Sequence, residues 1–251
     1  MFITFEGGEG SGKSTQIRML GERLRKEEGY PVVTLEEPGS TLLGKMLKAW
    51  LSHRDGALTL LPRPDTQLSL LETAIDDNSL PDILLHAAAP RTELLAFAIA
   101  RAQLVEERIR PNLRNNNIII CDRFSDSTVA YQGYGRGLDL KLIKMANDIA
   151  TQGIKPRLTI LLNLSPEEGL LRKFGGEKDD HFEGQVVDLL AFHRRVHEGY
   201  LKLAEEEPKR WLVVDAAQSR DRIAEIIWQK VSQLLSKKPR GVSKRGETPL
   251  F

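Results

Sequence analysis

The chain has 251 residues, of which 41% are hydrophobic, and this is enough to bury a sizeable core in one α/β domain. Its 36 lysines and arginines balance 35 aspartates and glutamates, so the net charge of +1 does not indicate a nucleic-acid partner. A single cysteine excludes an internal disulfide, glycines at 7–12 interrupt any signal-peptide pattern, and no apolar run approaches the roughly 20 residues that span a bilayer. We therefore expect a cytoplasmic protein with small-molecule ligands and no membrane partner.

Five short apolar runs rich in β-branched residues predict buried parallel strands, at residues 2–5, 31–35, 117–121, 157–163 and 211–214. Between them, apolar residues recur at spacings of three and four, which predicts helices at residues 13–28, 92–110, 139–151, 181–206 and 220–235. The alternation indicates right-handed βαβ units and a doubly wound α/β sheet of about five parallel strands flanked by helices. Ligands are expected beyond the carboxyl ends of the strands.

Two segments interrupt this scheme. Residues 53–90 contain four prolines and a leucine-rich middle, which predicts an insertion. The leucine-rich part could form a short helix that packs on the main body. One interpretation of the insertion is a packed or mobile segment that takes no part in the chemistry. Residues 237–251 carry five basic residues among glycines and prolines, which is typical of a solvated disordered tail, with a weak polyanion contact as the alternative. The main domain is expected over residues 1–236.

A glycine-rich segment follows the first predicted strand and opens the first predicted helix. Residues 7–14 read Gly-Gly-Glu-Gly-Ser-Gly-Lys-Ser and satisfy G-x-x-x-x-G-K-[ST]. Its backbone N–H groups can converge on phosphate oxygens, Lys13 adds charge for the β- and γ-phosphates, and Ser14 offers a hydroxyl to Mg²⁺. The motif predicts a P-loop NTPase-type fold that binds ATP with Mg²⁺. The residues expected to hold the nucleotide are Gly7, Gly8, Glu9, Gly10, Ser11, Gly12, Lys13, Ser14 and Thr15.

The same loop serves kinases, GTPase switches, motors and transport ATPases. A GTPase should carry an Asn-Lys-x-Asp-type stretch after a later strand, whereas the chain reads Asn-Leu-Ser-Pro at 163–166. A motor or transporter would usually be longer and carry a separate coupling signature. These comparisons favour a kinase.

A second polar cluster, Asp122 and Arg123, follows the strand predicted at 117–121. Asp122 is suited to hold Mg²⁺ or to position the reacting centre, and Arg123 can make a bidentate contact with an acceptor phosphate. An ion pair that caps the next helix is the alternative.

The ordered set of motifs resembles the thymidylate kinase family. The matching segments are Phe5-Glu6-Gly7 with the loop at 8–14, Glu37-Pro38-Gly39, residues 97–103, Asp122-Arg123-Phe124, Ser127, Ala130-Tyr131-Gln132-Gly133 and Gly137-Leu138-Asp139. The resemblance implies a transferase of nucleotide biosynthesis that moves the γ-phosphate of ATP onto dTMP and works as a homodimer.

The resemblance also implies an acceptor pocket around Phe97 and Arg101, which lie four apart and hence on one face of a helix. There the ring would stack on thymine and the guanidinium would reach its carbonyl edge. Without the resemblance, Phe97 would more often belong to the core and Arg101 to the surface.

Four more residues acquire roles from the resemblance. Glu9 would accept from the 3′-hydroxyl of the acceptor sugar, and a solvent-facing loop charge is its alternative. Tyr131 would pack on the deoxyribose and disfavour a 2′-hydroxyl. Gln132 would contact the base edge, and Ser127 would complete the pocket.

Two positions depart from the family pattern. Glu36 stands where an arginine usually precedes Glu-Pro-Gly, so an expected phosphate contact is missing or supplied by another residue. In the lid, residues 172–183, His181 stands where the family element carries arginine. The lid cations are then candidates for stabilising the transferring phosphoryl group: Arg172, Lys173 and Lys178. A mobile lid without a catalytic side chain is the alternative.

Phosphoryl transfer requires alignment and charge stabilisation rather than a nucleophilic triad. The residues expected to supply these are Lys13, Asp122, Arg123, Arg172 and Lys178. Two alternatives stay open at this point: a deoxynucleoside kinase, which needs a general base for a 5′-hydroxyl, and a nucleotide-binding regulatory protein without transfer activity.

Overall fold

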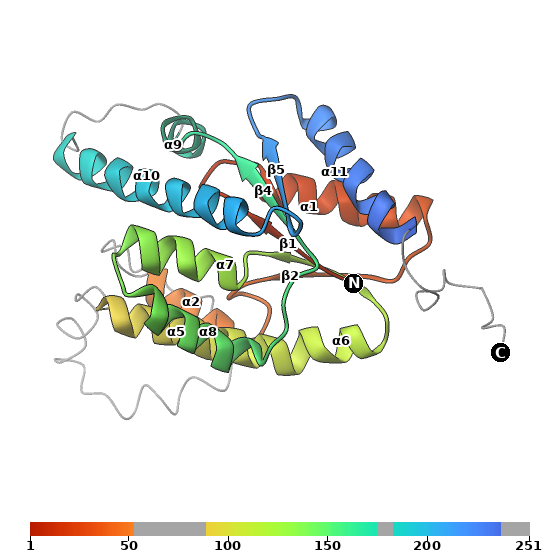
Figure 1. Cartoon of the computed structure of the whole chain (residues 1–251), viewed down its shortest axis with the longest axis horizontal. Coiled ribbons are helices and arrows are strands. Elements are labelled where there is room, and N and C mark those ends of the chain that lie inside the picture. Colours follow the sequence, from red (N-terminus) through yellow and green to blue (C-terminus); the bar gives the residue numbers. More distant parts are fainter. Residues whose placement is uncertain (53–88, 175–182, 237–251) are drawn as a thin grey trace, which may run out of the picture.

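Five parallel strands form the centre of the computed structural model, which describes residues 1–52, 89–174 and 183–236 (Figure 1). The strands are β1 (Phe2–Glu6), β2 (Val32–Glu36), β3 (Ile118–Asp122), β4 (Leu158–Asn163) and β5 (Trp211–Asp215). Their order, β2-β3-β1-β4-β5, places β1 at the centre between β3 and β4. Each strand begins and ends within one residue of its predicted bounds, and the predicted doubly wound parallel sheet is confirmed.

The prediction that all five strands are buried on both faces is wrong for two of them. The side chains of β1, β3 and β4 are almost entirely buried, whereas β2 and β5 expose part of theirs. Because β2 and β5 are the edge strands, each has a neighbouring strand on one side only, and the helical layers cover them incompletely.

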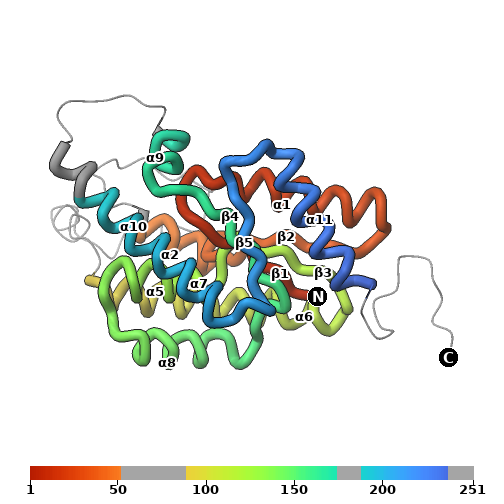
Figure 2. The backbone as a smooth tube through the Cα atoms, turned by 45° about the horizontal axis from the view of Figure 1, so that its top comes forward, coloured from red at the N-terminus to blue at the C-terminus, as the bar shows by residue number. Residues whose placement is uncertain are grey.

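One face of the sheet is covered by α1 (Lys13–Glu22) with its π-helical continuation η1 (Arg23–Glu27), and by α11 (Arg220–Ser236). Alternate side chains of β1, Ile3 and Phe5, pack there with residues of both helices. Figures 1 and 2 show α1 and α11 side by side. This face forms an apolar core.

The other face is covered by two groups of helices. The first runs continuously through α5 (Pro90–Leu104), η3 (Val105–Ile109) and α6 (Arg110–Arg114); the second comprises α7 (Ser125–Thr128), η4 (Val129–Gly135) and α10 (Glu183–Glu206). α8 (Leu140–Thr151) packs on α5 from outside through Ile143 and Leu94, as Figure 2 shows. α2 (Leu42–Ser52) also packs against α5.

Three helical segments were not predicted: α2, the α7–η4 stretch and α9 (Pro166–Phe174). The α7–η4 stretch contains glycines and tyrosines rather than a regular apolar period, and it is helical where it packs along α10. The helix predicted at 92–110 begins at Pro90 and continues to Arg114. The predictions for the 237–251 tail, and for nearly all of the insertion and most of the lid, lie outside the described residues.

α9 lies so close to the loop at 7–14 that their backbones are in contact. A Cβ on Gly169 would collide with the carbonyl oxygen of Glu9, and a Cβ on Gly10 would collide with the carbonyl oxygen of Gly169. Gly10 also has a φ of 66°, a left-handed conformation that side chains disfavour. α9, the first helix after β4, therefore packs directly against the loop at 7–14.

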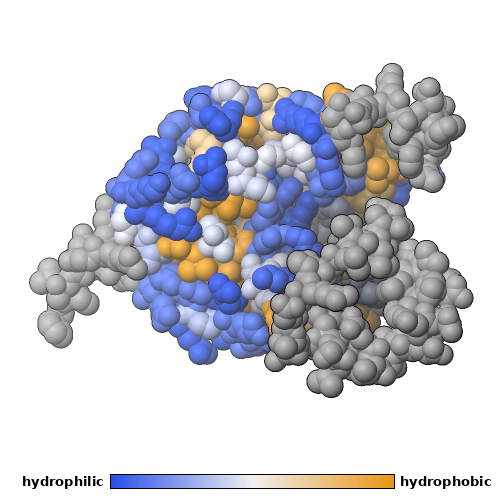
Figure 3. Space-filling model, turned by 180° about the vertical axis from the view of Figure 1, so that it is seen from behind, coloured by the Kyte–Doolittle hydropathy of each residue, from blue (hydrophilic) through white to orange (hydrophobic). Residues whose placement is uncertain are grey.

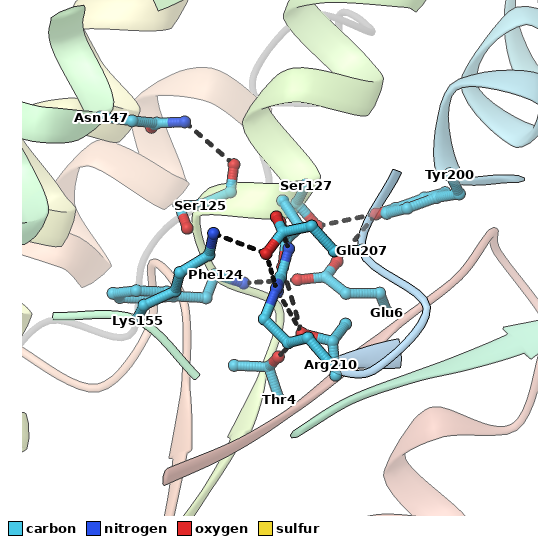
Figure 4. Close-up of polar contacts among 12 residues, drawn as sticks. Thr4, Glu6, Phe124, Ser125, Ser127, Asn147, Lys155, Tyr200, Glu207 and Arg210 are labelled. Atoms are coloured by element: carbon cyan, nitrogen blue, oxygen red, sulfur yellow. Dashed lines mark hydrogen bonds and ion pairs between the residues drawn. The ribbon is translucent and has the colours of Figure 1, made fainter. Parts of the chain in front are cut away.

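The second face of β1 carries polar side chains, Thr4 and Glu6, and both are fully buried. Glu6 accepts hydrogen bonds from the backbone N–H of Phe124 (2.9 Å), from the Ser127 hydroxyl and from the Tyr200 hydroxyl (2.9 Å). Figure 4 shows Glu6, Ser127 and Tyr200 converging from three different elements. One carboxylate thus connects β1, the segment after β3, and α10.

A second buried pair lies beside this cluster. Arg210 donates two hydrogen bonds to Asp126, at 2.6 and 2.9 Å, and one to Thr159, whose hydroxyl is 3.0 Å from that of Thr4. Both charged side chains are about nine-tenths buried. Buried charges of this kind are tolerated because each hydrogen-bonding group has a partner.

We expect Gly169→Ala to destabilise the fold by about 1–3 kcal/mol, because the added methyl group must push α9 away from the loop. Urea unfolding monitored by circular dichroism measures this change. The matched control is Gly21→Ala in α1, where the nearest atom is the mobile end of Arg25. That variant should keep or raise stability, by up to about 1 kcal/mol, and equal effects at the two sites would contradict the packing argument.

Burial is the largest of the effects that raise the pKa of Glu6 to about 8, and the nearby Asp126 charge adds to it. In the unfolded chain Glu6 loses its proton above about pH 4.5, whereas in the folded state it keeps the proton up to about pH 8. The free energy of unfolding should therefore fall as the pH rises from about 4.5 to 8. Glu6→Gln cannot titrate and should lose this contribution. The measurement is the free energy of unfolding of the wild type and of Glu6→Gln across that pH range. If the two proteins show the same dependence on pH, the raised pKa of Glu6 is contradicted.

Candidate active site

A cavity of about 850 Å³ opens at the carboxyl ends of β1, β2 and β3. Its wall contains most of the residues predicted from sequence: Glu9, Gly10, Ser11, Gly12, Lys13, Ser14, Thr15, Phe97, Arg101, Asp122, Arg123, Ser127, Tyr131, Gln132 and Arg172. Gly7 and Gly8 belong to the same loop but do not line the cavity, and Lys178 lies outside the described residues. Segments far apart in the sequence therefore share one site.

The loop at 7–14 holds Lys13 at its centre. The Lys13 ammonium donates to the carbonyl oxygens of Gly7 (3.1 Å) and Gly8 (2.8 Å). Burial lowers the pKa of Lys13 to about 8, and the nearby charge of Arg123 acts in the same direction. An ammonium in this position is attracted to any anion that enters the loop.

Ser14 and Asp122 lie together at the start of α1 and the end of β3. The Ser14 hydroxyl is 3.5 Å from Oδ2 of Asp122, while Oδ1 is buried and has no hydrogen-bond partner among the described residues. Burial raises the pKa of Asp122, although Lys13 and Arg123 oppose the shift. A hydroxyl beside an unsatisfied carboxylate oxygen fits one side of a Mg²⁺ coordination shell.

No group of three or more His, Cys, Asp or Glu side chains within residues 1–52, 89–174 and 183–236 is arranged to hold a metal. None of the helices in these ranges combines the length and hydropathy needed to cross a membrane.

Arg123 has a left-handed backbone, with φ of 66°, which turns its side chain into the cavity wall. The guanidinium lies 3.2 Å from the Tyr200 hydroxyl and 3.3 Å from the Ser127 hydroxyl, and it stacks 5.0 Å from the Tyr131 ring centre. It also forms a 3.3 Å ion pair with Glu9. Arg123 is thus held by the same hydroxyl groups that bind Glu6.

Glu9 forms ion pairs with Arg123 and Lys173, at 3.3 and 3.2 Å. Burial opposes ionisation of Glu9, but the two cations outweigh it and lower the pKa of the carboxyl group. The carboxylate therefore occupies the space between a cation from the end of β3 and a cation from the end of α9. Negatively charged ligands entering the cavity meet these two cations.

Arg101 differs most from its predicted role. Its side chain is almost fully buried, and it donates to Glu37, Asn147 and Thr128. The guanidinium still lines the cavity, so a contact with a base edge stays a prediction. Phe97, four residues earlier, also lines the cavity.

Of the two positions that depart from the family pattern, Glu36 lies within the described residues, and it forms an ion pair. Glu36 lines the cavity and pairs with Lys48 on α2, so a cation does lie beside the position where the family pattern has arginine. Arg172 also lines the cavity, donates to the carbonyl oxygen of Ala216 at 3.2 Å and pairs with Glu168. His181 lies outside the described residues.

Four residues of the site were not identified as functional from the sequence: Glu6, Glu37, Glu93 and Tyr200. Three of them are acidic residues in or beside apolar segments, and each contacts a side chain that lines the cavity. A buried acid in an otherwise apolar strand or helix is a signal for such a role. Tyr200 carries no comparable signal.

The comparisons with known proteins agree with this geometry. The family model described as thymidylate kinase matches residues 5–60 and 78–227. A thymidylate kinase of Geotalea uraniireducens is 42% identical over 223 residues, which cover 86% of this chain and 89% of that protein. A thymidylate kinase of Synechococcus sp. strain JA-3-3Ab is 42% identical over 96% of this chain and its own full length.

Among solved structures, the thymidylate kinase of Ehrlichia chaffeensis matches with a TM-score of 0.60 and 29% identity. The match covers 93% of this chain and 98% of that one. The family model and relatives of such identity and coverage confirm the resemblance drawn from the motifs. The chain belongs to the thymidylate kinase family.

Proposed function

We propose that this chain is an ATP-dependent dTMP kinase, which transfers the γ-phosphate of ATP to dTMP and releases dTDP and ADP. The observation that carries the proposal is a single cavity whose wall includes both the phosphate-binding loop and the residues expected to hold the acceptor. Arg123, between Glu9 and Tyr131, is the cation shared by the two halves. The proposed enzyme acts in the cytoplasm, in nucleotide biosynthesis.

The donor half is the loop with α1. Its backbone N–H groups and the positive end of α1 hold the phosphates, and Lys13 exchanges its carbonyl partners for β- and γ-phosphate oxygens. Ser14 and Asp122 are the residues that would hold Mg²⁺. Bound there, Mg²⁺ supplies charge neutralisation to the phosphate oxygens.

The acceptor half lies between Phe97 and Tyr131, with Gln132 at the base edge. Glu9 accepts from the 3′-hydroxyl of the acceptor sugar, which requires it to release at least one of its two cations. Arg123 then binds the acceptor phosphate and brings it in line with the γ-phosphate. Arg172 and Lys173 are the lid cations among the described residues that line the cavity, where they would meet the transferring group.

The proposed mechanism needs no general base, because a phosphate monoester is already a competent nucleophile near neutral pH. This separates it from a deoxynucleoside kinase, which must deprotonate a 5′-hydroxyl. The Glu6 carboxyl group is fully buried, already hydrogen-bonded to Phe124, Ser127 and Tyr200, and does not line the cavity, so it is not available as such a base. The family assignment also favours the monophosphate kinase.

We further propose that the active form is a homodimer. Three neighbouring helices, α2, α5 and α8, expose large apolar side chains: Leu42, Met46, Trp50, Leu95, Ile99, Met145 and Ile149. α5 packs against both α2 and α8, so these side chains belong to one side of the molecule. Figure 3 shows, from behind, orange apolar side chains at the centre of a largely hydrophilic face, whereas the proposed interface is defined by the exposed residues named above. Apolar side chains gathered in this way are typical of subunit interfaces.

Lys13→Ala should lower turnover of ATP with dTMP by at least about 100-fold, because it removes the cation that meets the transferring phosphate. The measurement is coupled ADP release. Lys155→Ala, at an exposed lysine that pairs with Glu207 and does not line the cavity, is the matched control and should keep wild-type turnover. Unchanged activity in Lys13→Ala would contradict the donor site.

The same assay with different acceptors tests the reaction. Wild-type turnover should be highest with dTMP, lower with the monophosphates of adenosine, guanosine and uridine, and absent with thymidine, which lacks the phosphate that Arg123 binds. Comparable rates on all monophosphates would reject dTMP as the acceptor. Faster phosphorylation of thymidine would favour a deoxynucleoside kinase instead.

Ile149→Lys should convert a dimer into a monomer, because it places a charge among the exposed apolar side chains of the proposed interface. Light scattering coupled to size-exclusion chromatography gives the molar mass. Val213→Lys, at an exposed position on β5, is the control and should stay dimeric. A monomeric wild type, or dissociation by both changes, would contradict the proposed interface.

A further inference from the structure

A glutamate on the first turn of α5 contacts a glutamine in the wall of the cavity. Glu93 is 7% exposed and Gln132 is 2% exposed. The side-chain nitrogen of Gln132 lies 2.7 Å from Oε1 of Glu93, and Arg136 donates to Oε2 of the same carboxylate at 3.2 Å. No role has yet been given to Glu93 in the donor or acceptor site.

The contact determines which way the Gln132 amide faces. A carboxylate only accepts hydrogen bonds, so the group that Gln132 turns toward Glu93 must be its NH₂ group. Glu93 lies in the first turn of α5, and Arg136 forms an ion pair with its carboxylate. Rotating the amide by 180° would set two oxygens against each other in a buried site, which is strongly disfavoured.

The other end of the amide is then an acceptor directed away from Glu93. Oε1 of Gln132 accepts no hydrogen bond from a described residue, and it is not among the fully buried polar atoms that lack a partner. Gln132 lines the cavity, so this oxygen opens onto it. The pocket therefore presents an acceptor, not a donor, at this point.

An acceptor here distinguishes two kinds of pyrimidine. Thymine and uracil carry N–H at ring position 3 and can donate to an amide oxygen. Cytosine has an unprotonated nitrogen at that position near neutral pH, and its lone pair would face the lone pairs of the oxygen. We infer that Glu93 is a positioning residue that makes the pocket select an N3–H base, by holding Gln132 with its oxygen toward the acceptor. The inference rests on the proposed base site between Phe97 and Tyr131.

Glu93→Gln should reverse the arrangement. The introduced amide has one acceptor oxygen, and Arg136 continues to require an acceptor. The NH₂ group of the introduced amide then faces Gln132, which turns its own oxygen toward it. As a result, Gln132 presents NH₂ to the cavity, which suits the unprotonated N3 of cytosine and opposes the N3–H of thymine.

The experiment compares kcat/KM for dTMP, dUMP and dCMP in the full chain. Glu93→Gln should lower the dTMP-to-dCMP ratio by about tenfold or more, mainly through KM, whereas the dTMP-to-dUMP ratio should stay constant because both bases carry N3–H. The double variant Glu93→Gln/Gln132→Glu places a carboxylate oxygen at the cavity and should restore the ratio toward wild type. A purely structural role of Glu93 would not give this recovery.

Glu107→Gln is the matched control. Gln103 donates to Glu107 on the same helical segment, but Glu107 is exposed and neither residue lines the cavity. The ratio should not change in this variant. Thermal unfolding verifies that each variant is folded, and calorimetric binding of dTMP and dCMP gives the same ratio for any variant without turnover.

Two outcomes would overturn the inference in distinguishable ways. If Gln132→Ala lowers the ratio but Glu93→Gln leaves it unchanged, the base site stands and Glu93 does not orient the amide. If Gln132→Ala also leaves the ratio unchanged, the base lies elsewhere, and both the proposed base site and the inference are wrong. If Glu93→Gln does not fold, the double variant Glu93→Gln/Gln132→Glu decides the question. A dTMP-to-dCMP ratio in the double variant that stays below the wild-type ratio would also overturn the inference.

Discussion

The carboxylate of Glu6 connects the elements that build the site. It is fully buried at the end of the central strand and accepts from Phe124, Ser127 and Tyr200, which belong to the segment after β3 and to α10. Ser127 and Tyr200 in turn contact the guanidinium of Arg123. A buried carboxyl group without these hydrogen-bond partners would be strongly destabilising, so the hydrogen bonds that stabilise Glu6 in the core also hold Arg123 in place. Stability and the geometry of the site therefore depend on one set of hydrogen bonds.

The cationic side chains in the cavity are paired with acceptor groups of the protein itself. Lys13 donates to loop carbonyl oxygens, and Glu9 pairs with Arg123 and Lys173. Phosphate groups offer more oxygens and more negative charge than these partners, so ligands can take over the contacts without a large rearrangement of the backbone. The close packing of Gly169 on Glu9 and Gly10 keeps the loop in position during that exchange. A site organised in this way is suited to aligning two phosphates, which is the main requirement of phosphoryl transfer.

Much of the site could be predicted from the sequence because its motifs are local. Successive residues form the loop at 7–14, and Asp122 and Arg123 directly follow a strand whose apolar composition is easy to identify. The supporting residues were missed for the opposite reason. Glu6 is 194 positions from Tyr200, Glu37 is 64 from Arg101, and Glu93 is 39 from Gln132, so no local pattern contains both members of a pair. The α7–η4 helix was missed because its helical form accompanies packing on α10.

The sequence by itself determined the five strands, the five helices predicted between and after them, the phosphate-binding loop and the family, because periodicity and short motifs are properties of neighbouring residues. Only the tertiary structure decided which polar groups meet. It buried Arg101 against Glu37, turned the Gln132 amide toward Glu93, and set Glu9 between two cations from different elements. The physical reason is that hydrogen bonds and ion pairs depend on distances of about 3 Å and on direction, and the chain specifies these only after the sheet and its helical layers have packed.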